Sequence, residues 1–225
     1  MIDPGHGGSD SGAVNKNGEE EKTFTLVIAK DLGAWLQKQG IETILTRNTD
    51  TFIPLTQRTA IANFDHADVF LSIHINASPS PLAKGAETYF MSRQATNLWS
   101  KQLAEKENAS SGGRSPDGNA LSMVLWSLAQ NRYMAESSDL AEAIQKRLND
   151  LLGTKERGVS QAPFVVLEGA EMPAVLVEVA FLTNPHEAAQ LSDSDFQDQV
   201  AATLGKAIMD FRAKHDGKNP ALPTP

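Results

Sequence analysis

A single run of apolar residues, Ala174 to Val179, limits most strongly what this chain can fold into. The run is apolar at every position except Glu178, and strands of this kind are buried on both faces, as the central strands of parallel sheets are. Other short β-type runs alternate with segments whose apolar residues have helical spacing. We therefore predict a three-layer α/β domain with a mostly parallel, mixed central sheet flanked by helices on both faces.

The remaining elements are predicted from the same two periodicities. After the opening run that ends at Asp3, further strands are expected over residues 41–46, 67–76, 85–91 and 162–167. Helices are expected over residues 20–39, 54–64 and 194–214, and over 139–152, where Asp139 and Glu142 form a capping-box pattern.

The stretch 96–134 interrupts this alternation of strands and helices. It contains two helical segments joined by a breaker-rich loop, which predicts a helical insertion. The domain is expected to span residues 1–214, followed by a Pro-rich, disordered tail at 215–225.

Composition excludes several classes of function. The 225 residues are enough for one globular domain, and the net charge of −8 argues against a nucleic acid or an anionic membrane as partner. No apolar run approaches the roughly 20 residues that cross a bilayer. The chain contains no Cys, so any metal ion must be held by His and carboxylate side chains.

Candidate metal ligands lie at the predicted carboxyl ends of strands, where α/β folds bind their ligands. His6 lies in a glycine-rich loop after the first strand, and His74 lies near the end of the strand 67–76. Two imidazoles and one carboxylate make the pattern of a catalytic zinc site with an open position. Glu21 at the start of the first helix could supply the carboxylate, but spacing alone does not separate it from Glu19 and Glu20.

Glu178 is a carboxylate inside a run that should be buried, and an unpaired buried carboxylate is costly. It therefore either forms a salt bridge or faces a cleft as a general base beside a metal. The position at a strand end favours the general base. The salt-bridge alternative needs one of three arginines, namely Arg47, Arg58 or Arg157.

Four motifs in this order resemble the catalytic domain of the zinc-dependent N-acetylmuramoyl-L-alanine amidases, the amidase 3 family. The resemblance covers residues 1–212. The motifs are Asp3-Pro4-Gly5-His6-Gly7-Gly8, then Gly18 through Glu21-Lys22, then Phe70-Leu71-Ser72-Ile73-His74-Ile75-Asn76-Ala77, and finally residues 173–184, which include Glu178.

The resemblance implies that His6, Glu21 and His74 bind one zinc ion, because the glutamate ligand of the family directly precedes a Lys. It also implies that Glu178 is the catalytic glutamate. The implied reaction is hydrolysis of the amide bond between N-acetylmuramic acid and L-Ala in peptidoglycan. From their adjacency to the ligands, Asp3 and Asn76 are expected to orient the imidazoles.

The insertion at 96–134 resembles the regulatory segment of the cell-division amidases. That resemblance implies a helix that covers the zinc ion with a blocking glutamate, which an activator with a LytM-type domain removes. Glu107 is preferred over Glu105 as the blocking residue because it directly precedes Asn; a solvated face of a charged helix is the alternative. Residues 121 and 124–126 (Leu121, Val124, Leu125, Trp126) are expected either to dock the activator or to pack internally.

A peptidoglycan substrate implies a periplasmic or cell-wall location. The chain opens one short turn before its first motif, so we expect the natural protein to extend further upstream, with the export signal there. The domain is expected to be a monomer. Two alternatives stay open: a zinc peptidase that cuts the stem peptide, and a catalytically inert peptidoglycan-binding module.

Overall fold

The computed structural model describes residues 1–111, 120–154 and 157–215, and within these it leaves the side chains of residues 111 and 120–132 undescribed. Five strands form one sheet in the order β1-β2-β5-β3-β4. The strands are β1 (Ile2–Pro4), β2 (Phe70–Asn76), β3 (Glu87–Met91), β4 (Val159–Ala162) and β5 (Ala174–Phe181). Three neighbouring pairs are parallel and the β3–β5 pair is antiparallel, so the predicted mixed sheet is confirmed.

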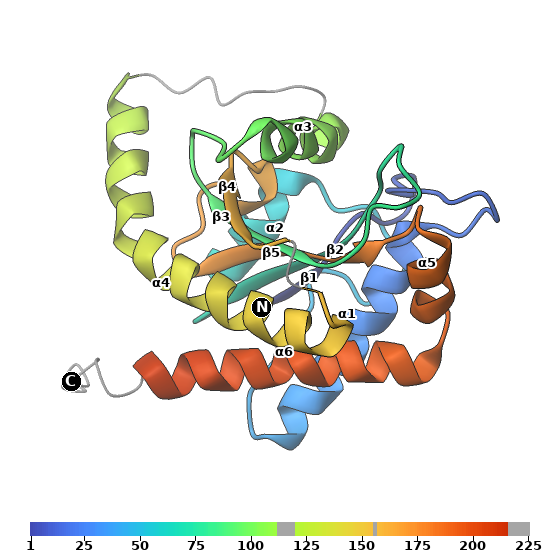
Figure 1. Cartoon of the computed structure of the whole chain (residues 1–225). Coiled ribbons are helices and arrows are strands. Elements are labelled where there is room, and N and C mark those ends of the chain that lie inside the picture. Colours follow the sequence, from blue (N-terminus) through green and yellow to red (C-terminus); the bar gives the residue numbers. More distant parts are fainter. Residues whose placement is uncertain (112–119, 155–156, 216–225) are drawn as a thin grey trace.

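The sheet is covered by helices on both faces, which confirms the three-layer prediction (Figure 1). One face packs against α1 (Glu21–Lys38), α4 (Ala120–Leu152), α5 (Pro185–Leu191) and α6 (Ser194–His215), and this layer contains the larger apolar core. The other face packs against α2 (Leu55–Phe64), α3 (Leu98–Glu107) and the short 3-10 helix η2 (Val165–Leu167). A second 3-10 helix, η1 (Asn108–Ser111), follows α3.

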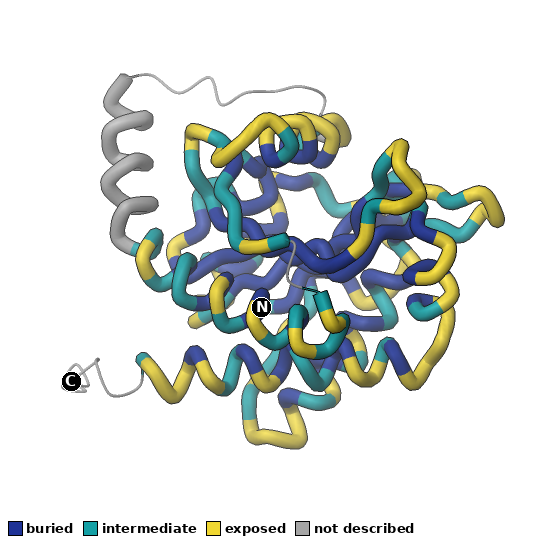
Figure 2. The backbone as a smooth tube through the Cα atoms, viewed as in Figure 1, coloured by how far each residue is buried: buried dark blue, intermediate teal, exposed yellow. Residues whose placement is uncertain are grey.

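Strands β2 and β5 lie in the middle of the sheet, and every residue of both is buried (Figure 2). The apolar run that contains β5 is therefore paired on both edges and packed on both faces, as its composition requires. Because β2 and β5 are parallel, their carboxyl ends lie side by side, and the register pairs His74 with Glu178.

Three sequence predictions of secondary structure were wrong. Residues 41–46 form no strand, since β1 is only three residues long and pairs with this segment through one bridge, Ile2 to Leu45. The predicted strand 162–167 ends at Ala162, because Pro163 has no N–H to donate and the chain turns into η2.

The third error concerns α4, which is one helix from Ala120 to Leu152. Asp139 lies in its interior and does not cap a helix; its carboxylate pairs with Lys214 and His215 of α6. His215 is therefore partly buried and held, although the sequence placed it in a frayed terminus. The predicted loop at 112–119 and the tail from residue 216 onward lie outside the described residues.

No helix in the described part of the chain is long and apolar enough to cross a lipid bilayer.

Candidate metal centre

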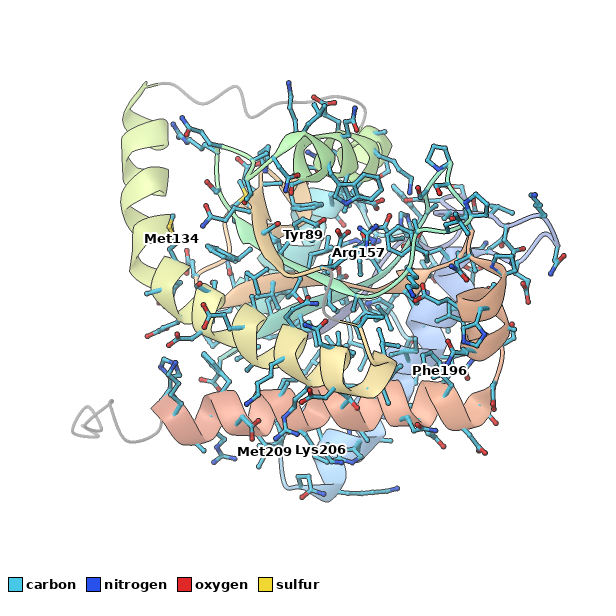
Figure 3. The ribbon with its side chains drawn as sticks, viewed as in Figure 1. Tyr89, Met134, Arg157, Phe196, Lys206 and Met209 are labelled. Atoms are coloured by element: carbon cyan, nitrogen blue, oxygen red, sulfur yellow. The ribbon has the colours of Figure 1, made fainter. Side chains whose placement is uncertain are left out.

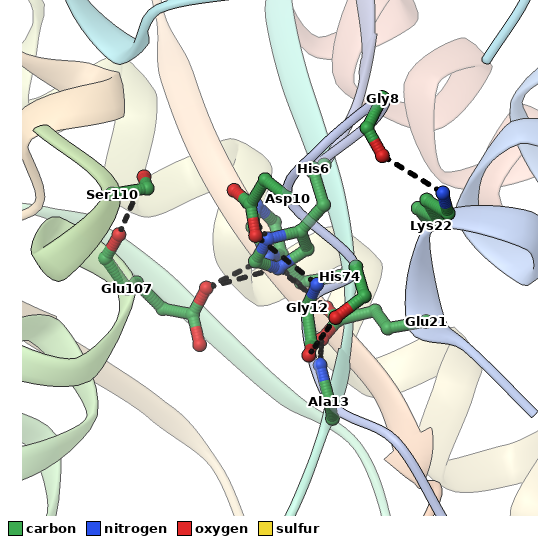
Figure 4. A network of polar contacts seen from close by, with 12 residues as sticks. His6, Gly8, Asp10, Gly12, Ala13, Glu21, Lys22, His74, Glu107 and Ser110 are labelled. Atoms are coloured by element: carbon green, nitrogen blue, oxygen red, sulfur yellow. Dashed lines mark hydrogen bonds and ion pairs between the residues drawn. The ribbon is translucent and has the colours of Figure 1, made fainter. Parts of the chain in front are cut away.

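Four buried side chains meet beyond the carboxyl ends of β1 and β2. Each of His6, Glu21, His74 and Glu107 offers one ligand atom, and these atoms lie within 4.8 Å of one another. They come from four separate elements, namely the loop after β1, the first residue of α1, the end of β2 and the last residue of α3. Figure 4 shows Glu107 reaching the two rings from the side opposite Glu21.

The four distances between a His nitrogen and a Glu oxygen in this cluster have the length of the edges of a tetrahedral zinc site. Nε2 of His6 lies 3.1 Å from Oε1 of Glu21 and 3.2 Å from Oε2 of Glu107. Nδ1 of His74 lies 3.3 Å and 3.2 Å from the same two oxygens. A tetrahedral zinc site with bonds of about 2.0 Å places its ligand atoms about 3.3 Å apart. The donor set therefore has the size and the chemistry of a zinc site.

The hydrogen bonding of the cluster supports the same fit. The ring nitrogens of His6 and His74 and Oε2 of Glu107 are buried and have no partner with hydrogen-bond geometry. Buried polar atoms normally have partners. Three of these atoms, Nε2 of His6, Nδ1 of His74 and Oε2 of Glu107, face one another and converge on a position that suits a cation.

The glycine-rich loop allows this convergence. His6 itself has φ 58°, which is uncommon for a residue with a side chain. A Cβ at Gly5 would lie 2.6 Å from Nε2 of His74, and a Cβ at Gly12 would lie 2.6 Å from Oε2 of Glu21. Only glycine lets the backbone pass this close to two of the ligands.

Glu21 is the glutamate of the first helix that points into the cluster, and backbone amides hold it there. Its Oε2 accepts a hydrogen bond from the Ala13 N–H and its Oε1 accepts one from the Ile75 N–H, each at 2.8 Å. Glu19 bonds Asn15 and Ser192, and Glu20 lies near Lys22 on the surface. The structure thus separates three carboxylates that spacing alone could not.

The electrostatics of the cluster favour positive charge at its centre. Burial alone would lower the pKa of His6, but Glu21, Asp10 and Glu107 outweigh it and raise that pKa to about 12. Burial likewise opposes a raised pKa at His74, where Glu107 and Glu21 raise it to about 9. Burial would raise the pKa of Glu21, yet the two imidazoles lower it to about 2. Carboxylates that hold protons this firmly on imidazoles would also attract a divalent cation.

Glu178 lies one strand from His74 and is fully buried, and neither of its carboxylate oxygens has a hydrogen-bond partner. The predicted salt-bridge alternative is wrong for all three arginines. Arg58 pairs with Asp3, Arg157 pairs with Glu87, and Arg47 bonds backbone carbonyls. Burial, and after it the charge of Glu107, raise the pKa of Glu178 well above its ordinary value. A carboxyl group in this state can exchange a proton with a neighbour.

Asp3 and Asn76 do not orient the imidazoles, in contrast to the sequence prediction. The oxygens of Asp3 accept hydrogen bonds from Thr46, Arg58 and Ser72. A register shift between His74 and Asn76 redirects the second side chain, whose Nδ2 donates to Glu87 at 3.0 Å.

The residue beside the His6 ring is Asp10, whose Oδ2 lies 3.0 Å from Nδ1 of His6. The sequence motifs did not predict this residue. The only available signal was an acid four residues after the histidine within the same loop.

Helix α3 brings Glu107 to the cluster, whereas Glu105 faces solvent and lies 3.7 Å from Lys101. The helix is anchored at both ends. Trp99 Nε1 donates to Glu87 at 3.0 Å, and the Asn108 side chain bonds the Pro163 carbonyl and the Val165 N–H, each at 2.8 Å.

Glu87 collects four donors beneath the start of α3. Its Oε2 accepts hydrogen bonds from Asn76, Tyr89 and Trp99, and its Oε1 pairs with Arg157 at 2.6 Å. Tyr89 and Arg157 lie on the α3 side of the sheet, and Phe196, Lys206 and Met209 lie on the α6 side (Figure 3). The buried carboxylate thereby ties the strand next to Glu178 to the helix that carries Glu107.

Comparison with known proteins identifies the relatives of this chain. A sequence model described as N-acetylmuramoyl-L-alanine amidase matches residues 1–210. The amidase AmiA of Salmonella typhimurium is 39% identical over 216 residues, which cover 94% of this chain and 75% of that protein. The amidase AmiC of Escherichia coli O6:H1 is 37% identical over 218 residues, which cover 95% of this chain and 52% of that protein.

The fold agrees with the sequence relatives. The crystal structure of an N-acetylmuramoyl-L-alanine amidase from Clostridium difficile 630 superposes with a TM-score of 0.72 at 31% identity, and the match covers 97% of this chain and 96% of that one.

Proposed function

Since this chain belongs to the N-acetylmuramoyl-L-alanine amidase family, we propose that it hydrolyses the amide bond between N-acetylmuramic acid and L-Ala in peptidoglycan with a zinc ion held by His6, Glu21 and His74. The observation that carries this proposal is the pairing of a buried cluster of two His and two Glu donors with an unpartnered, fully buried carboxylate one strand away. A binding module has no need of such a carboxylate, whose burial costs stability.

The chemistry divides between the ion and Glu178. A zinc ion in this cluster would lower the pKa of a water molecule and polarise the scissile carbonyl. Glu178 accepts the proton of the attacking water and passes it to the leaving amine of L-Ala. The raised pKa of Glu178 suits both halves of this transfer, since the group must bind the proton and then release it.

The other residues keep the ligands in place. Asp10 lies against the ring nitrogen of His6 that points away from the cluster and orients the ring. The two backbone amides on Glu21 fix its carboxylate in the same way.

We propose further that α3 holds the site closed through Glu107. The Glu107 carboxylate is the fourth member of the donor cluster and lies where the attacking water or the substrate carbonyl would need to be. The charge of Lys106, whose Nζ lies 3.4 Å from Oε1 of Glu107, steadies the carboxylate there. In this state the chain is autoinhibited.

Activation then requires a partner that moves α3. We propose an activator with a LytM-type domain that docks on the insertion at 96–134, as in the cell-division amidases that this segment resembles. The side chains of the candidate docking residues, Leu121, Val124, Leu125 and Trp126, lie outside the described part of the structure. Because peptidoglycan is the substrate, we place the enzyme in the periplasm or at the cell wall.

The test is hydrolysis of purified peptidoglycan followed by mass spectrometry of the products, with and without a chelator. The amidase releases peptides with free N-terminal L-Ala, whereas a stem peptidase leaves L-Ala on the glycan. Since the wild type is expected to be closed, Glu107→Ala is assayed beside it, and Glu105→Ala is the matched control. Absence of L-Ala-terminated peptides from Glu107→Ala with zinc bound would refute the amidase proposal.

A further inference from the structure

Arg47 is a buried cation that lies directly behind the metal centre. Its side chain is 3% exposed, and within the described residues its guanidinium donates to neutral oxygen acceptors alone. The ion pairs of the described residues do not include it. Arg58, which lies nearby and is equally buried, instead has the carboxylate of Asp3 at 2.9 Å. A charged group held in this way by carbonyl dipoles needs a reason other than charge pairing.

The acceptors of Arg47 belong to the two segments that carry His6 and Glu21. On the His6 side, Nε donates to the Pro4 carbonyl at 3.1 Å and Nη2 donates to the Gly5 carbonyl at 2.8 Å. On the Glu21 side, Nη2 also donates to the Lys22 carbonyl at 2.9 Å and to Oγ1 of Thr25 at 3.1 Å. One guanidinium therefore bonds the residues directly before His6 and the residue directly after Glu21.

A second hydrogen bond joins the same two segments. The Thr25 hydroxyl donates to the Gly5 carbonyl at 2.9 Å, so Gly5 is held both by Arg47 and by the helix that begins at Glu21. Arg58 makes no such bridge, because it donates to Asp3, to Ile53 and to the carbonyls of Pro4 and His6. Arg58 therefore holds the His6 loop but does not bond the helix that carries Glu21.

We propose that Arg47 is a positioning residue of the metal centre, which fixes Nε2 of His6 against Oε1 of Glu21 at 3.1 Å. This inference rests on the proposed zinc site. His6 has a left-handed backbone conformation, which is strained for a residue with a side chain, so its loop needs an external support to stay in place. Arg47 supplies this support and links the loop to the helix that carries the second ligand, Glu21.

Only an arginine can make this bridge. Its planar fork presents several N–H donors in fixed directions and keeps its charge in a buried site, whereas a lysine presents one point charge. The loop leaves room for the fork because a Cβ at Gly7 would lie 2.9 Å from Nε of Arg47. We therefore expect Arg47→Lys to keep the charge and lose the bridge.

The experiment measures zinc affinity by competition with a chromophoric chelator, at a temperature where circular dichroism shows each variant folded. Arg47→Lys is compared with the wild type and with Arg147→Lys, a control on the α4–α6 surface where Arg147 pairs with Asp210. The expected result is an increase of about 10- to 100-fold in the zinc Kd of Arg47→Lys, the usual loss for a residue that orients a ligand. The control is expected to bind zinc as the wild type does.

Thr25→Val serves as a second variant, because it removes one member of the bridge without touching a charge. It is expected to raise the zinc Kd by about threefold to tenfold, which corresponds to one hydrogen bond. If Arg47→Lys does not fold, the zinc Kd of Thr25→Val alone tests the proposal.

Three outcomes would overturn parts of the argument separately. If the variants lose stability equally with and without zinc and keep the wild-type Kd, Arg47 only supports the fold and the positioning role is refuted. If the wild type binds no zinc, the proposed metal centre is refuted, and the positioning role of Arg47 is refuted with it. If the wild type binds zinc but neither it nor Glu107→Ala cleaves peptidoglycan, the proposed reaction is refuted. The zinc Kd of Arg47→Lys still tests the positioning role of Arg47 in that case.

Discussion

Replacing Glu178 separates the stability of this fold from its activity. The residue is 0% exposed in the centre of the sheet, and neither carboxylate oxygen has a partner. A residue retained for structure would be paired, so its loss would destabilise the protein. A residue retained for proton transfer costs stability, so its removal should stabilise the protein while hydrolysis is lost.

The magnitude follows from the burial of the unpartnered group. Leaving a buried polar group without a hydrogen bond costs about 1–3 kcal/mol. Glu178→Met keeps an unbranched side chain and removes both oxygens, so the metal-free variant should be more stable by about 1–3 kcal/mol. For a chain of this length, 1 kcal/mol corresponds to roughly 2–4 °C in Tm. Glu178→Gln keeps two polar atoms and should gain less.

The pH dependence has a definite sign. The folded-state pKa of Glu178 is raised, so the folded chain keeps a proton that the unfolded chain has already lost. Below the ordinary pKa of 4.5 both states are protonated and the carboxyl charge costs nothing. As the pH rises from there toward the folded pKa, the wild type loses stability relative to Glu178→Gln, and the gap between them widens.

The assay combines urea unfolding of the chelator-treated proteins at pH 4 and pH 7 with hydrolysis by the zinc-loaded proteins in the Glu107→Ala background. Hydrolysis should fall by about 10²- to 10⁴-fold in Glu178→Gln, the range for a general acid–base group. Destabilisation of Glu178→Met by more than about 1 kcal/mol would show a structural role and refute the reasoning. Hydrolysis within tenfold of the parent would refute the catalytic assignment.

Further changes test the closure and the framework around the site. Glu107→Ala should raise the basal rate of peptidoglycan hydrolysis while Glu105→Ala leaves it unchanged, and equal rates would contradict autoinhibition. Trp99→Phe keeps an aromatic side chain but removes the Nε1 donor to Glu87, so the basal rate should rise by about tenfold or less; an unchanged rate would show that this end of α3 does not hold it closed. Asp3→Asn leaves the guanidinium of Arg58 buried without a carboxylate and should cost about 3–5 kcal/mol in urea unfolding, whereas a cost below about 1 kcal/mol would show that the buried pair contributes little.

The sequence was enough to predict a mixed, mostly parallel sheet and to place His6, His74 and Glu178 at the ends of its strands. A strand buried on both faces is recognisable from composition alone, and parallel strands bring their carboxyl ends together. The three residues lie at such ends, so their proximity followed from the fold class. Resemblance to a family then selected Glu21, whose carboxylate two backbone amides hold within the cluster.

Contacts between distant segments could not be predicted in this way. Arg47 and Arg58 were considered as partners of Glu178, since a buried carboxylate calls for a cation, but both guanidiniums are occupied by backbone carbonyls of the His6 loop. Periodicity describes one element at a time and contains no information about which carbonyls a long side chain reaches. The error at Asp139 has the same origin, because its partners lie on α6 and not in its own helix.

The geometry of α3 explains why opening would require a partner. The register places His74, Glu178 and Glu87 in one row across β2, β5 and β3, so the outer two lie about 9.6 Å apart. Trp99 and Glu107 are eight residues apart on α3, or about 12 Å along the helix, and they contact Glu87 and His74 respectively. Helix α3 therefore spans this row of three residues. It covers Glu178 between two polar contacts, that of Trp99 with Glu87 and that of Glu107 with His74. In the proposed closed state, α3 must move away before a peptidoglycan strand can reach Glu178. Each of these two contacts opposes that movement, as do the apolar contacts of Leu103 and Ala104. Because these contacts act together to hold α3 in place, a binding partner is the most direct source of the energy to move it, which is the physical argument for the proposed activator.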